Sequence, residues 1–105
     1  KREKPERSSV LDGIPQHLPA LALADKVIGK AEKIGLLDPD APGPFSVTNE
    51  AELGAILLAM VSSARAAGID AEGALRGAVR ELQVEIREVE LDDAADAGVI
   101  ALPAE

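Results

Sequence analysis

The stretch DAEGALRGAVRELQVEIREVE, residues 70–90, decides the fold of this chain. Its large apolar residues recur at alternating spacings of four and three, a pattern typical of one helix face in a coiled-coil-like contact. These residues, which we call the seam, are Leu75, Val79, Leu82, Ile86 and Val89. The pattern predicts a long helix whose seam packs against another helix.

Charged residues of the same stretch are assigned to the surface of this helix. Asp70 is placed to cap it, and Glu72 precedes Arg76 by four residues, a favourable surface pair. Three further acids follow at spacings of four and three, namely Glu81, Glu85 and Glu88. Arginines are interspersed among these acids, and their face lies opposite the seam. We therefore interpret the acids as a solvated face and not as a metal site.

A second helix is predicted upstream, from Asn49 to just before Gly68. Asn49 followed three residues later by Glu52 resembles a capping box, in which the glutamate side chain reaches back to the amide of the cap residue. Its apolar face comprises Leu53, Ile56, Leu57, Met60, Val61 and Ala64. A strip of small residues, Ala55, Ala59 and Ser62, would let another helix approach closely. The short link GID, residues 68–70, predicts a tight antiparallel hairpin with the next helix.

A first helix is predicted between Pro19, which suits the first turn, and Gly35, which suits the position just past the end. Residues 36–49, LLDPDAPGPFSVTN, contain three prolines and one glycine and are predicted to form a loop. The predicted fold class is therefore all-α, with three helices. We divide the chain into a linker or entry segment (1–17), a helical domain (18–92) and an acidic C-terminal tail (93–105).

Composition excludes several classes of function. The net charge is −8 and Phe45 is the only aromatic residue, which argues against binding to nucleic acid. The absence of cysteine excludes disulfides and thiolate metal sites and fits a cytoplasmic location. No apolar run approaches the roughly 20 residues of a membrane span. The single histidine, His17, is predicted to be an exposed turn residue, so no nucleophilic triad is expected.

Two stretches resemble a known family. They are DGIPQHLPALALADKV at 12–27 and ELGAILLAMVSSARAAG at 52–68, followed by REVE at 87–90. Together they are similar to the C-terminal domain of MazG, the bacterial nucleoside triphosphate pyrophosphohydrolase, over residues 8–90. The resemblance implies an all-α, Mg²⁺-dependent enzyme that cleaves nucleoside triphosphates to monophosphates and pyrophosphate. Family members carry the metal ligands in two acidic motifs, E-E-x-x-E and E-x-x-D.

The metal-binding motifs of the family are largely missing here. Glu52 matches the first residue of E-x-x-D and would be a vestigial metal ligand, whereas Ala55 stands at the aspartate position. The proline-rich loop stands where the E-E-x-x-E helix is expected. The resemblance therefore implies a degenerate, inactive structural domain: an incomplete four-helix bundle completed by dimerisation. We expect the seam and the strip of small residues to form the interface of this homodimer. We expect no catalytic residue, no substrate-binding residue and no cofactor in this fragment, with Mg²⁺ bound by a companion N-terminal MazG domain of the same protein.

Two alternatives remain open at the level of sequence. One is an active pyrophosphatase with atypical ligands, such as Glu50, Glu52 and acids of another subunit. The other is a small acidic interaction module that binds a partner helix along the seam.

Overall fold

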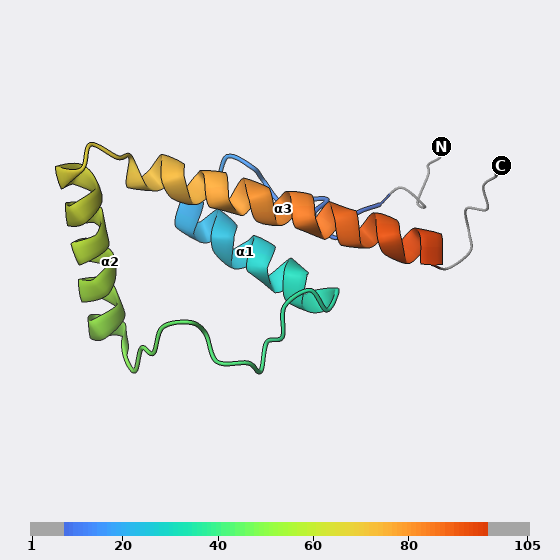
Figure 1. Ribbon diagram of the computed structural model, residues 1–105, viewed down its shortest axis with the longest axis horizontal. Coiled ribbons are helices and arrows are strands. Elements are labelled where there is room, and N and C mark those ends of the chain that lie inside the picture. The colour runs from blue at the N-terminus through green and yellow to red at the C-terminus, as the bar shows by residue number, and fades with distance from the viewer. Residues whose placement is uncertain (1–7, 97–105) are drawn as a thin grey trace.

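The structure, a computed structural model, describes residues 8–96 and contains three helices (Figure 1). These are α1 (Ala20–Lys33), α2 (Glu50–Ala66) and α3 (Ala71–Asp96). No strand occurs in this part of the chain, so the predicted all-α class is confirmed.

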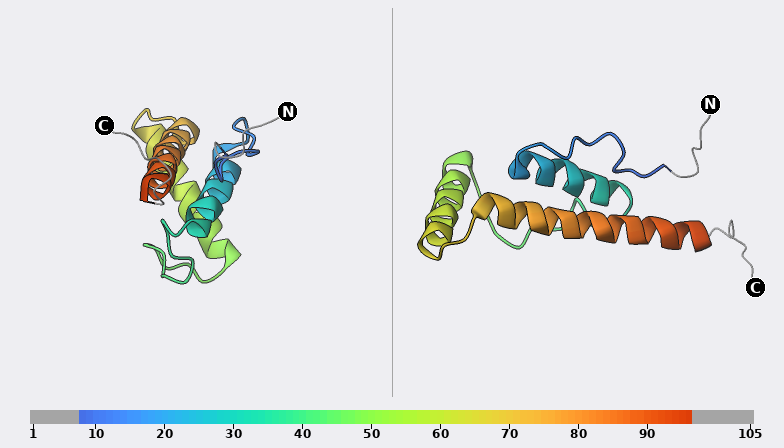
Figure 2. Two further views of the ribbon diagram at one scale, coloured as in Figure 1. Left: turned by 90° about the vertical axis from the view of Figure 1, so that its right-hand side faces the viewer. Right: turned by 90° about the horizontal axis from the view of Figure 1, so that it is seen from above.

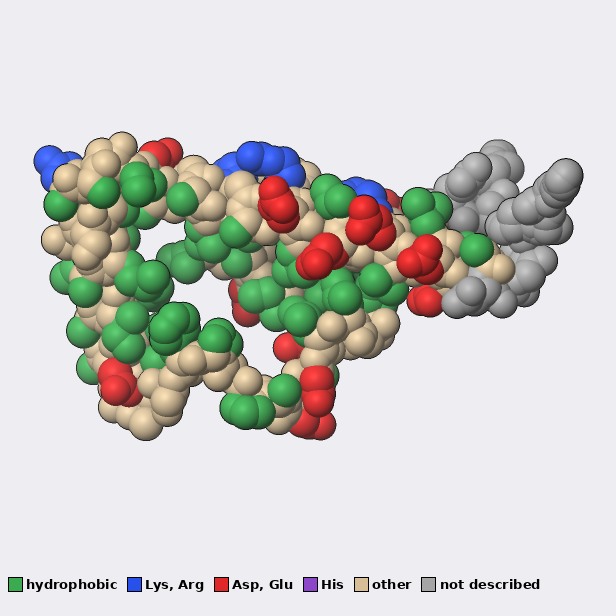
Figure 3. All heavy atoms as spheres, viewed as in Figure 1, with side chains coloured by type: hydrophobic (Ala, Val, Ile, Leu, Met, Phe, Trp, Pro, Cys, Tyr) green, Lys and Arg blue, Asp and Glu red, His purple; other side chains and the backbone are tan. Residues whose placement is uncertain are grey.

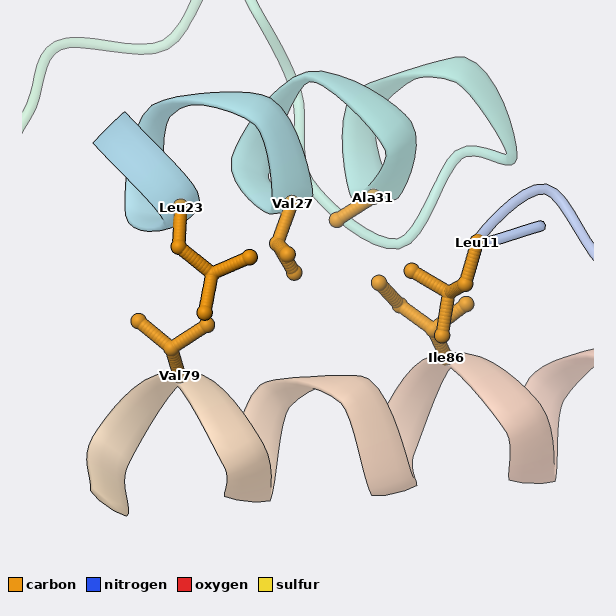
Figure 4. Packing of buried hydrophobic residues seen from close by; sticks show 6 residues of the cluster. All are labelled: Leu11, Leu23, Val27, Ala31, Val79 and Ile86. Atoms are coloured by element: carbon orange, nitrogen blue, oxygen red, sulfur yellow. The ribbon is translucent and has the colours of Figure 1, made fainter. Parts of the chain in front are cut away.

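The hydrophobic core lies between α1 and α3. The two helices run side by side, and α2 stands at one end of the pair (Figure 2). Leu23, Val27 and Ala31 of α1 face Val79 and Ile86 of α3 (Figure 4). Ala31 has no exposed surface, and a small side chain at such a position allows the two helix backbones to approach closely. The α1–α3 pair therefore holds the buried centre of the molecule.

Two glycines end α1 and α2, as the sequence predicts. Gly35 has a φ of 82°, and the N–H of Leu36 donates to the carbonyl of Ala31 at 2.9 Å. Gly68 has a φ of 75° and ends α2 with the same pattern of hydrogen bonds. Glycine adopts this left-handed backbone conformation without the steric cost that a Cβ atom brings. The C-terminal ends of both helices are therefore determined by the local sequence.

The predicted antiparallel hairpin of α2 and α3 is wrong. The two helices are bent by 107° at the break between them, so α2 stands across the end of α3 and does not lie along it. The reason is that α1 already covers the seam of α3, so this surface is not available to α2. Within residues 8–96, the helix α2 is therefore left without a partner along most of its length.

Part of the predicted linker segment belongs to the packed structure. Leu11 is only 3% exposed and joins the core. Both carboxylate oxygens of Glu90 hold the neighbouring turn: Ser9 Oγ donates to one and the N–H of Val10 to the other, each at 2.8 Å. Residues 9–16 thus pack on α3 by side-chain and backbone contacts, whereas residues 1–7 lie outside the described part.

The start of α1 is attached to α3 by the predicted Glu72–Arg76 pair. The two side chains form a salt bridge of 3.1 Å, and Glu72 also accepts a hydrogen bond of 2.8 Å from the N–H of Ala20. Arg76 in turn donates to the carbonyl oxygens of Gln16 and Leu18, at 3.0 and 2.7 Å. The pair therefore satisfies backbone groups at a helix start that would otherwise lack partners.

The helix α3 continues to Asp96. The predicted acidic tail thus begins inside α3, and residues 97–105 lie outside the described part. Within residues 8–96, no single helix is long and apolar enough to cross a membrane. The helices α2 and α3 meet that test only as a bent pair.

Candidate functional site

The seam, predicted as an interface with another chain, is covered mainly from within the chain. Val79 and Ile86 are buried in the core, and Leu75 and Leu82 pack against it partly buried. Val89 is also half-buried. The physical reason is that α1 and the segment around Leu11 supply the apolar surface that the seam needs. Little of the seam is therefore left to contact another chain.

Glu52 serves the start of α2. Asn49 is the N-cap, and its Oδ1 accepts a hydrogen bond of 2.8 Å from the N–H of Glu52, as predicted. The glutamate side chain differs from the prediction: Oε1 accepts from the N–H of Thr48 at 2.7 Å and from Thr48 Oγ1 at 2.8 Å, and not from the amide of Asn49. These hydrogen bonds, the backbone one first, lower the pKa of the Glu52 carboxyl below its ordinary value.

The lowered pKa of Glu52 predicts a pH dependence of the helix start. Because the folded pKa lies below the unfolded one, the stabilising contribution is present above the unfolded pKa and is lost as the pH falls through the folded value. Thr48→Val removes the hydroxyl donor but keeps the backbone N–H, so we expect it to raise the Glu52 pKa only part of the way. A carboxyl-carbon NMR titration measures this, with Thr48→Ser as the matched control. An unchanged Glu52 pKa in the valine variant would contradict the hydroxyl contact.

The acidic residues do not fit a magnesium site. Mg²⁺ requires near-octahedral coordination by several oxygen atoms. The Oε1 of Glu52 is held by Thr48, Ala55 offers no ligand one turn later, and Glu50 lies two positions away on a helix and so points in a different direction. In residues 8–96, no group of three or more acidic, histidine or cysteine residues is placed to hold a metal ion.

The other polar residues singled out in the sequence lie apart from Glu52. His17 is exposed in the turn before α1. The three acids of the third helix, Glu81, Glu85 and Glu88, are exposed on α3, as predicted for a solvated face. These residues therefore form no common site with Glu52.

The unusual surface of the molecule is α2 itself. No residue of this helix is buried. Leu57 is half-buried, and the other five large apolar side chains are 36% to 71% exposed. Those residues are Leu53, Ile56, Leu58, Met60 and Val61. A helix without charged residues over its middle turns is normally covered by other structure. The sequence already indicated an apolar helix, because no charged residue occurs between Glu52 and Arg65. Its exposure was not expected, because the predicted hairpin with α3 would have covered it.

A groove runs between α2 and the beginnings of α1 and α3. It has a volume of about 640 Å³, and its apolar lining comes from all three helices and the link between α2 and α3. The lining residues are Leu21, Leu57, Met60, Val61, Ile69 and Leu75. Hydrophobic side chains gather along α2 on the side that faces the rest of the chain (Figure 3). We call this surface, together with the exposed residues of α2, the α2 face.

The chain has a relative in Streptomyces cacaoi, described as an uncharacterized 26.1 kDa protein in the blaB 3′ region. The two are 39% identical over 89 residues, which cover 84% of this chain and 34% of that protein. The chain thus spans about a third of the length of the relative that it matches. No family model matches the chain, and no solved structure matches it significantly.

Proposed function

We propose that this chain is a noncatalytic helical domain that self-associates within a longer protein of the MazG type. One observation carries the proposal: α2 is a 17-residue helix with no buried residue and no charge between Glu52 and Arg65. Exposed apolar surface of this extent is typical of an interface. Self-association would cover it and complete the incomplete bundle.

The proposed whole protein converts nucleoside triphosphates to monophosphates and pyrophosphate in the cytoplasm. Its Mg²⁺ site would lie in a companion N-terminal MazG domain, because the acids of residues 8–96 are not grouped as metal ligands. The Streptomyces relative supports such a companion domain, because the match covers only 34% of its length. The resemblance of residues 12–27 and 52–68 to the family motifs supports the class.

Self-association is tested on the 105-residue chain by sedimentation equilibrium and by light scattering after size exclusion. We expect a homodimer at micromolar concentration that dissociates on dilution. Met60→Glu places a charge on the exposed α2 face and should give a monomer of unchanged helicity. Arg80→Met, on the exposed side of α3, is the control and should stay dimeric. A wild-type chain that is monomeric at high concentration would refute the proposal.

Absence of catalysis is tested separately with a panel of nucleoside triphosphates. We expect no pyrophosphate release above the background rate with millimolar Mg²⁺. We also expect no rise in Tm when Mg²⁺ is added, because a ligand that does not bind the native state does not stabilise it. Turnover that Glu52→Gln abolishes would instead establish the atypical enzyme with ligands such as Glu50 and Glu52.

The same exposed helix also favours a second candidate, a module that binds an apolar helix of a different protein. The two candidates differ in what Met60→Glu changes. In a self-associating domain, the variant lowers the molar mass of the purified particle in solution from that of a dimer to that of a monomer. In a binding module the wild-type chain is already a monomer, and the variant weakens binding to the other protein.

A further inference from the structure

We infer that the partner on the α2 face is the α2 helix of a second copy, packed antiparallel about a two-fold axis between Leu58 and Ala59. This inference rests on the proposed self-association and specifies its geometry. It replaces the seam, which α1 covers, with a face of α2 on which Leu53 and Met60 are exposed and Leu57 and Ala64 are half-buried. The pattern of apolar residues, the charges at the two ends of α2 and the position of the groove each support it.

The apolar residues of α2 are symmetric about their own midpoint. Leu53, Leu57, Met60 and Ala64 recur at spacings of four, three and four, which read the same in both directions. In an antiparallel pair centred between residues 58 and 59, Leu53 therefore lies opposite the partner's Ala64. Leu57 likewise lies opposite the partner's Met60. Each large residue meets an apolar residue, as in antiparallel coiled-coil layers.

The charges at the two ends of α2 select the antiparallel direction. The first turn carries Glu50 and Glu52, and the last turn carries Arg65. Parallel pairing would bring the acidic turns of both copies together. Antiparallel pairing places each acidic turn against the partner's Arg65 and also opposes the two helix dipoles. The charges thus disfavour one orientation and favour the other.

The groove lies at the end of α2 where the partner helix would begin. Beyond Val61, the apolar surface continues onto Leu21, Ile69 and Leu75, so the partner's first turns have apolar surface to cover. Two acids also line this groove, Asp70 and Glu72. Glu72 is paired with Arg76, whereas Arg65 supplies the positive charge on α2 that faces the partner's acids.

Cysteine cross-linking tests the direction, because the natural chain contains no cysteine. We expect the double variant Leu53→Cys/Ala64→Cys to form a covalent dimer on mild oxidation. Each single variant should remain noncovalent, and a mixture of the two should give only the mixed dimer. Positions 53 and 64 of one helix are about 16 Å apart, too far for a disulfide within the chain. Covalent dimers of a single variant would show parallel pairing and overturn the inference.

Charge reversal tests the pairing of the helix ends. Arg65→Glu and Glu50→Arg should each raise the dimer dissociation constant by about tenfold, since each change places like charges together at two symmetric positions. The double variant Glu50→Arg/Arg65→Glu should return to within about threefold of wild type. Arg80→Glu, on the exposed side of α3, is the matched control and should have no effect.

The outcomes separate this inference from the proposed function. A wild-type dimer that none of the α2 substitutions weakens would overturn the antiparallel α2 pairing while leaving self-association in place. A monomeric wild-type chain would refute the proposed function itself. Circular dichroism of each variant checks that the helices are retained. A lower molar mass in solution then reports on association and not on unfolding.

Discussion

Ile86→Ala is expected to lower the free energy of unfolding by about 2–5 kcal/mol. Ile86 has no exposed surface and lies on α3 opposite the end of α1, beside Leu11 (Figure 4). Truncation removes apolar contacts and leaves a cavity that a close-packed helix pair fills only in part. Because domains of this size are stable by only about 5–15 kcal/mol, the loss is a large fraction of the total.

Urea denaturation followed by circular dichroism at 222 nm measures this loss. Val84→Ala is the control on the same helix, because Val84 is 52% exposed. We expect it to change stability by less than about 1 kcal/mol, since it removes little buried surface. Equal effects of the two substitutions would contradict the packing of α1 and the Leu11 segment on α3.

Leu11→Ala is expected to cost as much as a helical core position, again about 2–5 kcal/mol. Leu11 lies outside the helices, in the predicted linker or entry segment (1–17), yet it is 3% exposed and packs beside Ile86. The turn that carries it is held by Glu90 through Ser9 and Val10. The substitution therefore tests whether the folded unit begins near Ser9 or at Leu18.

The control for Leu11 is Leu91→Ala, since Leu91 is 66% exposed on α3. The same denaturation measurement should show a small effect for this variant. If Leu11→Ala and Leu91→Ala behaved alike, residues 9–16 would contribute nothing to the fold and the domain would start at Leu18.

Local chemistry explains which parts of the fold could be predicted. Gly35 and Gly68 end their helices because a left-handed residue stops a helix wherever it stands, and Asn49 starts one because its side chain satisfies a free N–H. Such signals act over three or four residues and are readable in the sequence. The start of α2 and the ends of α1 and α2 follow from them.

The arrangement of the helices was not readable in the same way. The apolar residues of α2 and those of α1 are both able to cover the seam, and periodicity does not say which helix does so. The structure gives this place to α1, helped by the Glu72–Arg76 pair that attaches its first turn to α3. The choice depends on contacts between residues more than 50 positions apart, Ala20 and Glu72 among them.

The start of α2 was predicted in its cap residue but not in the geometry of the Glu52 side chain. The sequence indicated that Glu52 begins a helix and that Ala55 offers no ligand beside it. It did not indicate that Thr48 provides both donors to the carboxylate, because a side chain of that length reaches either of two neighbouring amides. Nor did it show that α2 stands free, since exposure is a property of the whole arrangement.

The lack of buried residues in α2 has a consequence for local stability. An isolated helix of this length is marginal in water, so little within one chain holds α2 closed. Its amide hydrogens should therefore exchange with solvent at low cost in a dilute sample, while those of α1 and the middle of α3 open only with the core. In a self-associating chain, protection of α2 rises with protein concentration. The hydrogen-exchange protection of α2 then reports the fraction of chains that are assembled.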